Sequence, residues 1–123
     1  MLDHIGIGVT DFAKAKAFYD LALAPLGITK IMEVTVVETG AYEGAGYGSD
    51  RPFFWIGSAQ KTTPVHIAFR AKDHDAVKAF HSGGLKSGGH DNGGAGPRAD
   101  YSPTYYAAFL IDPDGNNVEA VCT

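Results

Sequence analysis

The second half of this sequence repeats the beginning of the first half. Segments 4–18 and 66–80 align without a gap, and identical residues recur 62 positions apart: His4/His66, Ile5/Ile67, Asp11/Asp73, Lys16/Lys78, Ala17/Ala79 and Phe18/Phe80. Two copies of one supersecondary unit seldom bury their apolar faces separately, so we expect them to pack on each other. The repeat therefore predicts one domain, residues 1–123, made of two modules at about 1–60 and 61–123.

The first copy has the pattern of a strand followed by a helix. Residues 3–9 alternate between apolar residues and small or polar ones, which is typical of a strand with one apolar face. Asp11 is placed to cap a helix, and Pro25 with Gly27 should end it. Further strands are expected at 28–38, 41–47 and 52–57.

The second copy follows the same plan. A strand at 65–71 precedes a helix that Asp73 caps and that should end at Gly83 and Gly84. A glycine-rich segment then predicts a weak strand and a loop. Strands at 105–111 and 117–121 flank a tight turn at 112–115. Both halves thus read β-α-β-β-β, an α+β fold.

Three potential metal ligands share one side of these strands. His4 and His66 alternate with the apolar residues that should face the helices, and Glu119 alternates with Val118 and Ala120. Two neutral imidazoles and one carboxylate suit divalent iron, manganese, zinc or nickel. A helix-free face that is simply wetted by solvent would show the same alternation. Spacing alone leaves both interpretations open.

Two segments carry a resemblance to a known family. Residues 4–11 read His-Ile-Gly-Ile-Gly-Val-Thr-Asp, followed by Ala-Phe-Tyr at 17–19, and residues 112–119 read Asp-Pro-Asp-Gly-Asn-Asn-Val-Glu. These segments resemble the vicinal oxygen chelate superfamily: glyoxalase I, bleomycin-resistance proteins, fosfomycin-resistance enzymes and extradiol dioxygenases. The resemblance covers nearly the whole chain. It implies two βαβββ modules whose mixed sheet forms a cup with helices on the outer face. It also implies a divalent metal held by His4, His66 and Glu119.

One position departs from glyoxalase I. That enzyme has a fourth ligand, a glutamate, on the last strand of its first module, where segment 52–57 offers Phe54, Trp55 or Ile56. The glutamate is the natural base for its proton transfer, so ordinary glyoxalase I activity is disfavoured here. The resemblance then implies a metal-dependent lyase, dioxygenase or thiol transferase acting on a small oxygen-chelating substrate. The alternative is a metal-free dimer that sequesters a drug or metabolite, as bleomycin-resistance proteins do.

Other residues are candidates for roles around this site. The catalytic candidates are Tyr105, Arg70 and His90, and the substrate-binding candidates are Trp55, Phe54, Tyr106 and Arg98. Alternation sends Tyr105 and Tyr106 to opposite faces of their strand, so at most one of them lines the cup. Packing in the core or in a dimer interface would explain the aromatic residues equally well.

Composition narrows the partners. A net charge of −4 argues against nucleic acid and anionic membranes, and no apolar run approaches the roughly 18 residues of a membrane span. The single cysteine, Cys122, excludes an intrachain disulfide. With no basic leader before the first strand, a cytoplasmic location is expected. An apolar rim including Phe53, Trp55 and Tyr106 predicts a homodimer. The other expected partner is a small-molecule substrate.

Overall fold

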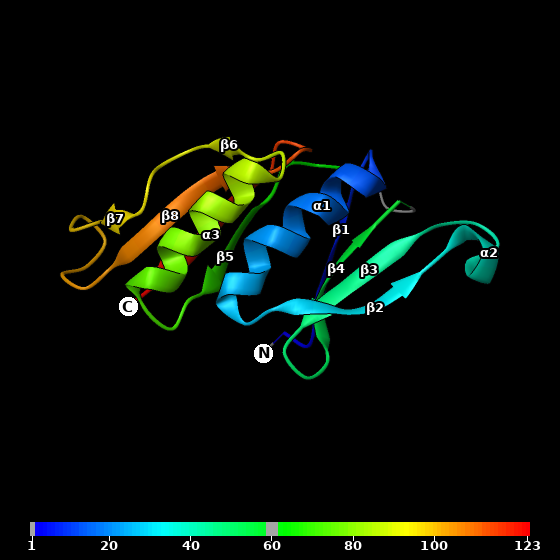
Figure 1. Cartoon of the computed structure of the whole chain (residues 1–123), viewed down its shortest axis with the longest axis horizontal. Coiled ribbons are helices and arrows are strands. Elements are labelled where there is room, and N and C mark those ends of the chain that lie inside the picture. Colours follow the sequence, from blue (N-terminus) through cyan, green and yellow to red (C-terminus); the bar gives the residue numbers. More distant parts are fainter. Residues whose placement is uncertain (1, 59–61) are drawn as a thin grey trace.

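The structure, a computed structural model, describes residues 2–58 and 62–123 (Figure 1). The first module contains β1 (Ile5–Gly8), α1 (Phe12–Leu23), the 3₁₀ turn η1 (Ala24–Leu26), β2 (Thr29–Val34), α2 (Val36–Thr39), β3 (Gly44–Gly48) and β4 (Pro52–Gly57). The second contains β5 (His66–Arg70), α3 (His74–Lys86), β6 (His90–Asp91), β7 (Gly96–Pro97), β8 (Tyr106–Ile111) and β9 (Asn117–Cys122).

The strands form two separate mixed sheets. The first has the order β1-β4-β3-β2, and the second has the order β5-β9-β8-β6, with β7 also paired to β8. In each module the first strand pairs in parallel with the last one, and the other pairs are antiparallel. The expected α+β class is confirmed. The mixed sheet, however, is divided between the two modules.

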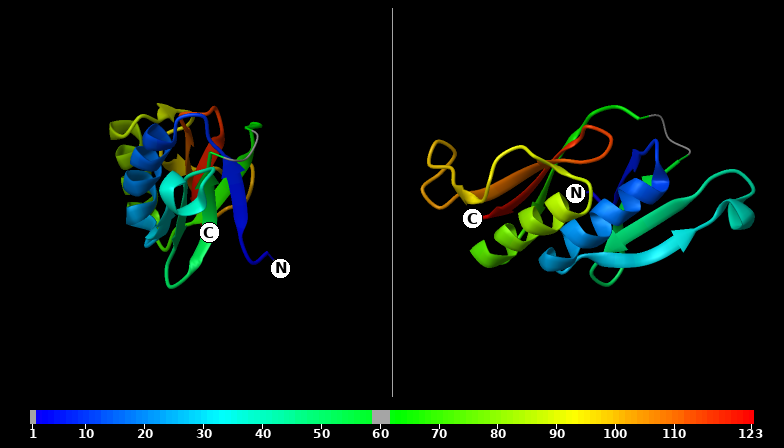
Figure 2. Two further views of the ribbon diagram at one scale, coloured as in Figure 1. Left: turned by 90° about the vertical axis from the view of Figure 1, so that its right-hand side faces the viewer. Right: turned by 45° about the horizontal axis from the view of Figure 1, so that its top comes forward.

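The helices cover one side of both sheets. α1 and α3 lie next to each other in one layer and the strands lie in the other, as the end-on view shows (Figure 2). The apolar core fills the space between the layers; its largest fully buried apolar side chains include Phe18, Phe54, Phe80, Tyr19 and Tyr47. In the part of the chain that the structure describes, no helix covers the opposite side of either sheet. That side is where alternation placed the candidate ligands.

Repeated sequence positions have the same structural role in both modules. Asp11 accepts a hydrogen bond from the backbone N–H of Lys14, and Asp73 accepts one from that of Ala76, so each aspartate caps its helix as predicted. Phe18 and Phe80 are both fully buried. The repeat in the sequence is therefore a repeat in the fold.

The strand expected at 28–38 ends earlier. The Thr35 hydroxyl oxygen accepts a hydrogen bond from the N–H of Glu38, and the Glu38 carboxylate accepts one from the N–H of Thr35. This capping box starts the short helix α2, which replaces the end of the strand. The next strand then begins at Gly44 rather than at residue 41.

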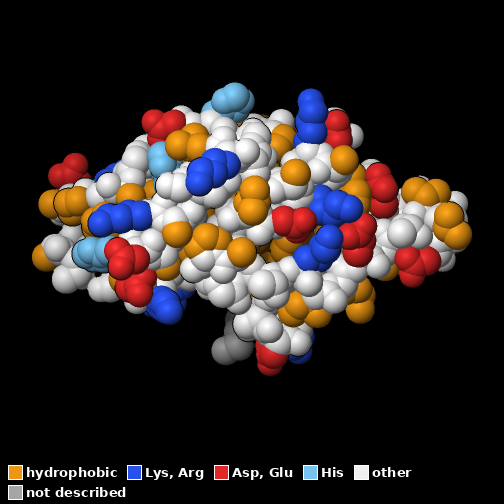
Figure 3. Space-filling view, in the orientation of Figure 1, with side chains coloured by type: hydrophobic (Ala, Val, Ile, Leu, Met, Phe, Trp, Pro, Cys, Tyr) orange, Lys and Arg blue, Asp and Glu red, His pale blue; other side chains and the backbone are white. Residues whose placement is uncertain are grey.

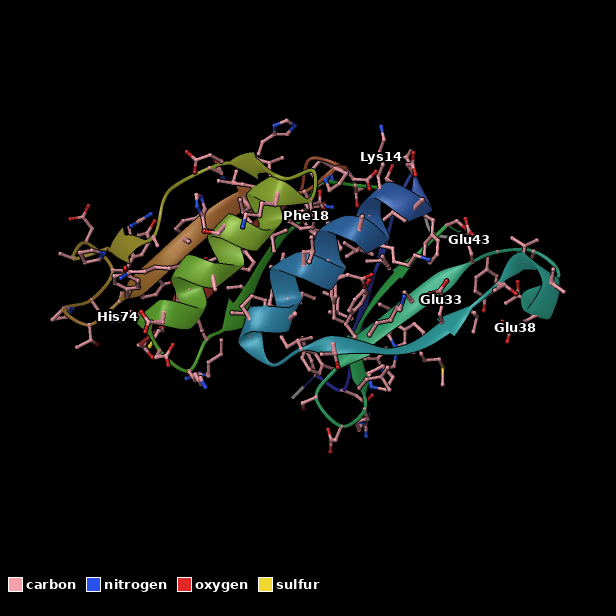
Figure 4. The ribbon with its side chains drawn as sticks, viewed as in Figure 1. Lys14, Phe18, Glu33, Glu38, Glu43 and His74 are labelled. Atoms are coloured by element: carbon pink, nitrogen blue, oxygen red, sulfur yellow. The ribbon has the colours of Figure 1, made fainter. Side chains whose placement is uncertain are left out.

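The helix of the second module, α3, was predicted to end at Gly83 and Gly84. In the structure it continues to Lys86. A Cβ atom at Gly84 would lie 2.2 Å from the Cδ1 atom of Leu110 and 3.2 Å from the Cε1 atom of Phe18, which points towards α3 (Figure 4). These glycines serve close packing of α3 against α1 and β8, not helix termination.

A buried carboxylate joins the two modules near the last strand. Asp112 accepts hydrogen bonds from the hydroxyl of Tyr19 on α1 (2.6 Å) and from the backbone and side chain of Asn116. Asp114 accepts one from the N–H of Thr10 (2.9 Å). The turn that leads into β9 is thus fixed against the first module, and Glu119 follows directly on β9.

Candidate functional site

Each sheet has a cavity on its helix-free side. The cavity on the first sheet has a volume of about 390 Å³ and contains His4; its other lining residues are Gly6, Val34, Tyr42, Gly44, Trp55, Ile56 and Gly57. The cavity on the second sheet has a volume of about 340 Å³ and is lined by His66, Tyr101, Tyr105, Phe109, Asn117 and Glu119. The candidate ligands are thus divided between two hollows.

His66 and Glu119 face each other in the second cavity. β5 and β9 are parallel neighbours, and the Nε2 atom of His66 lies 3.1 Å from Oε1 of Glu119. The Glu119 side chain is only 3% exposed, whereas that of His66 is 51% exposed. The expected orientation of both residues is confirmed by this contact. A buried carboxylate needs compensating partners, because desolvation penalises its charge.

Both ring nitrogens of His66 lie beside an oxygen that can only accept. Nδ1 is 3.1 Å from the backbone carbonyl oxygen of Asn117, and Nε2 is 3.1 Å from the Glu119 carboxylate. A neutral ring has one N–H and can donate to one of these oxygens at a time. If Nδ1 donates to Asn117, Nε2 presents its lone pair towards Glu119, an arrangement that a cation between the two groups would satisfy.

His4 has the same arrangement on the first sheet. Its Nδ1 atom lies 2.8 Å from Oδ1 of Asp3, and the other carboxylate oxygen of Asp3, Oδ2, accepts a hydrogen bond from Arg51. These two donors hold the pKa of the Asp3 carboxyl below its usual value, so it is ionised and accepts from Nδ1. Within residues 2–58 and 62–123, no hydrogen bond to the Nε2 atom of His4 is formed. The sequence reasoning missed Asp3, although its position directly before His4 was a visible signal.

The described parts of one chain contain no group of three or more His, Cys, Asp or Glu side chains placed to hold a metal ion. His66 and Glu119 provide two suitable donors at close range, and His4 belongs to the other sheet. These donor types suit a divalent cation, but they are divided into two parts: His66 with Glu119 at one sheet, and His4 at the other. A single chain does not bring these parts together.

Tyr105 is the aromatic residue that reaches the candidate site. Its hydroxyl donates a hydrogen bond to Oε2 of Glu119, and its ring packs edge-on against Tyr101 with the centroids 5.0 Å apart. The hydrogen bond to the carboxylate raises the pKa of Tyr105 to about 12. Tyr106 points to the opposite face and stacks on His74 at the start of α3 (Figure 4), so it lies outside this cavity. The predicted alternation holds.

The remaining candidates are spread over the surface and the core. Trp55 lines the cavity beside His4, but Phe54 is fully buried in the core and faces the helices. Arg98 lies over the ring of Phe109, with 5.4 Å from its Cζ atom to the ring centroid. Arg98 also donates to the carbonyl oxygens of residues 94 and 96.

Arg70 and His90 lie outside both cavities. Arg70 is exposed on the same face of β5 as His66 but does not line the second cavity. His90 lies in a different hollow, beside Lys14 and Ser87. Of the three catalytic candidates, Tyr105 is therefore the one that contacts Glu119. Arg70 and His90 do not line the cavity that contains this carboxylate.

Similar architectures occur among solved structures. A glyoxalase/bleomycin resistance protein from Albidiferax ferrireducens T118 is 29% identical, with a TM-score of 0.83 over 100% of this chain and 99% of that one. A putative glyoxalase from Bacillus halodurans is 22% identical, with a TM-score of 0.67 over 100% of this chain and 96% of that one. The chain has the vicinal oxygen chelate fold. The resemblance drawn from the two sequence motifs is thus confirmed.

The same fold also occurs in a protein with a much longer chain, of which the match covers less than half. Glyoxalase I from Zea mays is 20% identical, with a TM-score of 0.71 over 98% of this chain but only 45% of that one. No family model matches the sequence, and no curated protein is significantly similar to it. Identity at this level establishes the architecture, not a reaction.

The surface agrees with the composition. Charged side chains of both signs are interspersed with apolar ones over the helix-bearing side (Figure 3), without a continuous basic area there. Among residues 2–58 and 62–123, none of the helices has the length and apolar composition needed to span a bilayer.

Proposed function

We propose that the protein is a divalent-metal-dependent enzyme acting on a small oxygen-chelating substrate. His66 and Glu119 would hold the cation together with His4 of a second copy of the chain. When bound, such a cation supplies Lewis-acid chemistry that stabilises negative charge on substrate oxygens. The substrate would occupy the space between the two cavities.

One observation carries this proposal. Both histidines have an acceptor oxygen within hydrogen-bond distance of Nδ1, His4 that of Asp3 and His66 that of Asn117, so Nε2 is the nitrogen that each would offer to a cation. Metal-ligating histidines have this arrangement, because the outer acceptor fixes the tautomer and orients the ring. A merely wetted face would not require the same arrangement at two repeated positions.

The division of the ligands between two sheets supports a dimer. His4 is 59% exposed and His66 is 51% exposed, so both are open to another molecule. A two-fold pairing that places the first sheet of one copy against the second sheet of the other would create two equivalent sites. Each site would then contain both histidines and Glu119.

The reaction should differ from that of glyoxalase I. No carboxylate is found among the described residues that line the cavity beside His4, where the fourth ligand and base would be needed. We therefore propose a reaction of the lyase, dioxygenase or thiol-transferase type that leaves coordination positions for two substrate oxygens. Screening the metal-loaded protein for catechol cleavage, thiol addition to epoxides and hemithioacetal isomerisation separates these classes.

The cation site is tested by the substitution His66→Ala. After the protein is stripped with a chelator, Mn²⁺ binding is measured by calorimetry on the wild type, on His66→Ala and on His90→Ala as the matched control. Removing His66 should reduce the affinity at least about tenfold, because a protein donor is lost. His90 lies in another hollow, so its replacement should change nothing. Equal Mn²⁺ binding by all three proteins would falsify the assignment.

The alternative function is sequestration of a drug or metabolite by a metal-free dimer. The cavity beside His4, with Trp55 and Tyr42 in its lining, favours it. A wild-type protein that shows no Mn²⁺, Fe²⁺, Zn²⁺ or Ni²⁺ binding but retains a tight organic ligand would establish this function instead.

A further inference from the structure

Phe109 connects a charged residue outside the second cavity with one of the candidate ligands. Its ring stacks on the imidazole of His66, with the centroids 6.4 Å apart and the planes inclined by 21°. Arg98 lies over the same ring, and both contacts are within the range in which such groups attract each other. Phe109 also pairs directly with Glu119 across β8 and β9. It is thus adjacent to both ligands of the second cavity.

The backbone of Phe109 is held by the segment 92–98, which we call the strap and which runs beside β8 (Figure 1). The N–H of Asn92 donates to the carbonyl oxygen of Phe109 (3.0 Å), and the N–H of Phe109 donates to that of Gly93 (2.8 Å). β7, near the end of the strap, pairs with the start of β8. The strap therefore fixes the strand position from which the Phe109 ring projects.

Arg98 ties the strap together with its side chain. Its guanidinium donates to the carbonyl oxygens of Gly94 (2.8 Å) and Gly96 (3.0 Å), so it is fixed in place over the ring of Phe109. Arg98 is not among the described residues that line the second cavity. Its charge thus supports the ring and does not face the space beside His66.

Glycine is required where the strap, the guanidinium and the ring meet. Gly93 has a φ of 141°, which is sterically unfavourable for residues with a side chain. A Cβ atom there would lie 3.2 Å from Nη2 of Arg98 and 3.2 Å from Cδ1 of Phe109. The neighbouring Gly94 has nothing within 4 Å of an added Cβ atom. A methyl group at residue 93 would therefore disturb the stack, and one at residue 94 would not.

The strap reaches His66 by a second route as well. The Nδ2 atom of Asn92 donates to Oδ1 of Asn117 (3.2 Å), and the backbone carbonyl oxygen of Asn117 lies 3.1 Å from Nδ1 of His66. The side chain of His66 is 51% exposed, so contacts of this kind are needed to limit its motion. A ligand that is already held in one orientation loses less conformational entropy when it binds a cation.

We propose that the strap, acting through Phe109 and Arg98, orients the ring of His66 for binding a cation. Phe109 and Arg98 are positioning residues, because neither offers a donor atom to the cation. That His66 binds a divalent cation rests on the proposed function. The orientation of the ring by the strap does not depend on a metal and can be measured without one.

The substitutions Gly93→Ala and Gly94→Ala provide the matched comparison, since each adds one methyl group to the strap and keeps its carbonyl oxygens. In the metal-free protein, nuclear Overhauser contacts between the ring protons of His66 and Phe109 report the stack, with the His66 signals assigned from His66→Ala. We expect these contacts to weaken in Gly93→Ala and to persist in Gly94→Ala.

The same pair of variants is then compared in Mn²⁺ binding by calorimetry. Gly93→Ala should bind Mn²⁺ about 3- to 10-fold more weakly than Gly94→Ala. The expected effect is smaller than the roughly 10- to 100-fold typical of groups bonded to a metal ligand, because the strap acts through the Phe109 ring. A folded Gly93→Ala protein with the ring contacts and Mn²⁺ affinity of the wild type overturns the proposal.

Replacement of the ring itself distinguishes stacking from a general loss of structure. Phe109→Leu should weaken Mn²⁺ binding about 3- to 10-fold, and Phe109→Tyr, which keeps an aromatic ring, should restore the affinity to within about twofold of the wild type. Wild-type affinity in Phe109→Leu, or no recovery in Phe109→Tyr, overturns the role of the ring.

The proposed function fails in a different way. If the wild type binds no Mn²⁺, the metal-dependent enzyme is overturned, and the ring contacts of the two glycine variants still decide whether the strap orients His66. If the wild type and Gly93→Ala bind Mn²⁺ equally, the cation site stands and the role of the strap is overturned.

Discussion

Tyr105 and Glu119 form the most informative residue pair of the candidate site. The hydroxyl of Tyr105 occupies one oxygen of Glu119, and His66 lies against the other. Each of the two oxygens of this carboxylate therefore has one side-chain partner. Alternation along β8 limited the choice to Tyr105 or Tyr106, and only the packed structure shows that Tyr105 reaches β9.

The first prediction concerns the ionisation of Tyr105. The pKa of this phenol should be about 12 instead of 10, because its hydrogen bond to Glu119 stabilises the protonated form and the adjacent carboxylate disfavours the phenolate. The difference in ultraviolet phenolate absorbance between wild type and Tyr105→Phe isolates this group. The substitution Glu119→Gln should move its titration back towards 10. Tyr101→Phe serves as a control that leaves the Glu119 contact in place.

The sign of the effect on stability follows from the raised pKa. The hydrogen bond to Glu119 stabilises the fold fully below about pH 10, where Tyr105 is neutral in both the folded and the unfolded chain. This contribution is lost as the pH rises from about 10 to about 12. A Tyr105 titration near 10 in the folded wild type would contradict the pair.

At the scale of elements, the contact between α1 and α3 depends on glycine. A Cβ atom at Gly83 would lie 2.5 Å from the backbone oxygen of Leu21, an atom that cannot rotate away. Glycine here is required by the close approach of the two helices. The sequence suggested instead that Gly83 and Gly84 end the helix, because glycine is also common at helix ends.

The second prediction is that Gly83→Ala destabilises the protein. Alanine in an exposed helix position would gain about 1 kcal/mol over glycine, but the clash with Leu21 should produce a net loss of about 1–3 kcal/mol in the free energy of unfolding. Denaturant unfolding measures it. Ser82→Ala, at an exposed position of the same helix, should be neutral or slightly stabilising. A Gly83→Ala protein as stable as Ser82→Ala would argue against this helix contact.

At the scale of the whole molecule, the two sheets of one chain keep His4 apart from His66 and Glu119. The third prediction follows: neither His4→Ala nor His66→Ala alone should form a complete site, but a mixture of the two should. In a mixed dimer, one site receives His4 from one copy and His66 with Glu119 from the other. Random reassociation should restore about one quarter of the wild-type Mn²⁺ sites.

Two outcomes would contradict a shared site, one from the mixing experiment and one from sedimentation. If the mixture binds no more Mn²⁺ than the separate variants, the ligands do not come from two copies. Sedimentation at low micromolar concentration is the companion measurement. A single species near 13.0 kDa would rule out the dimer on which the shared site depends.

The sequence by itself determined features that depend on neighbouring residues along the chain. The repeat gave two strand–helix units with aspartate caps at Asp11 and Asp73, because a cap requires only the next turn of backbone. Alternation oriented His4, His66 and Glu119 towards the helix-free side, because side chains of a strand point to opposite faces in turn.

The tertiary structure decided which of these features meet. Pairing of β5 with β9 brings His66 to Glu119, and the division into two sheets leaves His4 in a separate cavity. Phe54 and Trp55 are adjacent in sequence, yet one is buried in the core and the other lines that cavity. Strand order and helix approach arise from contacts between segments far apart in the chain, and no local pattern encodes them.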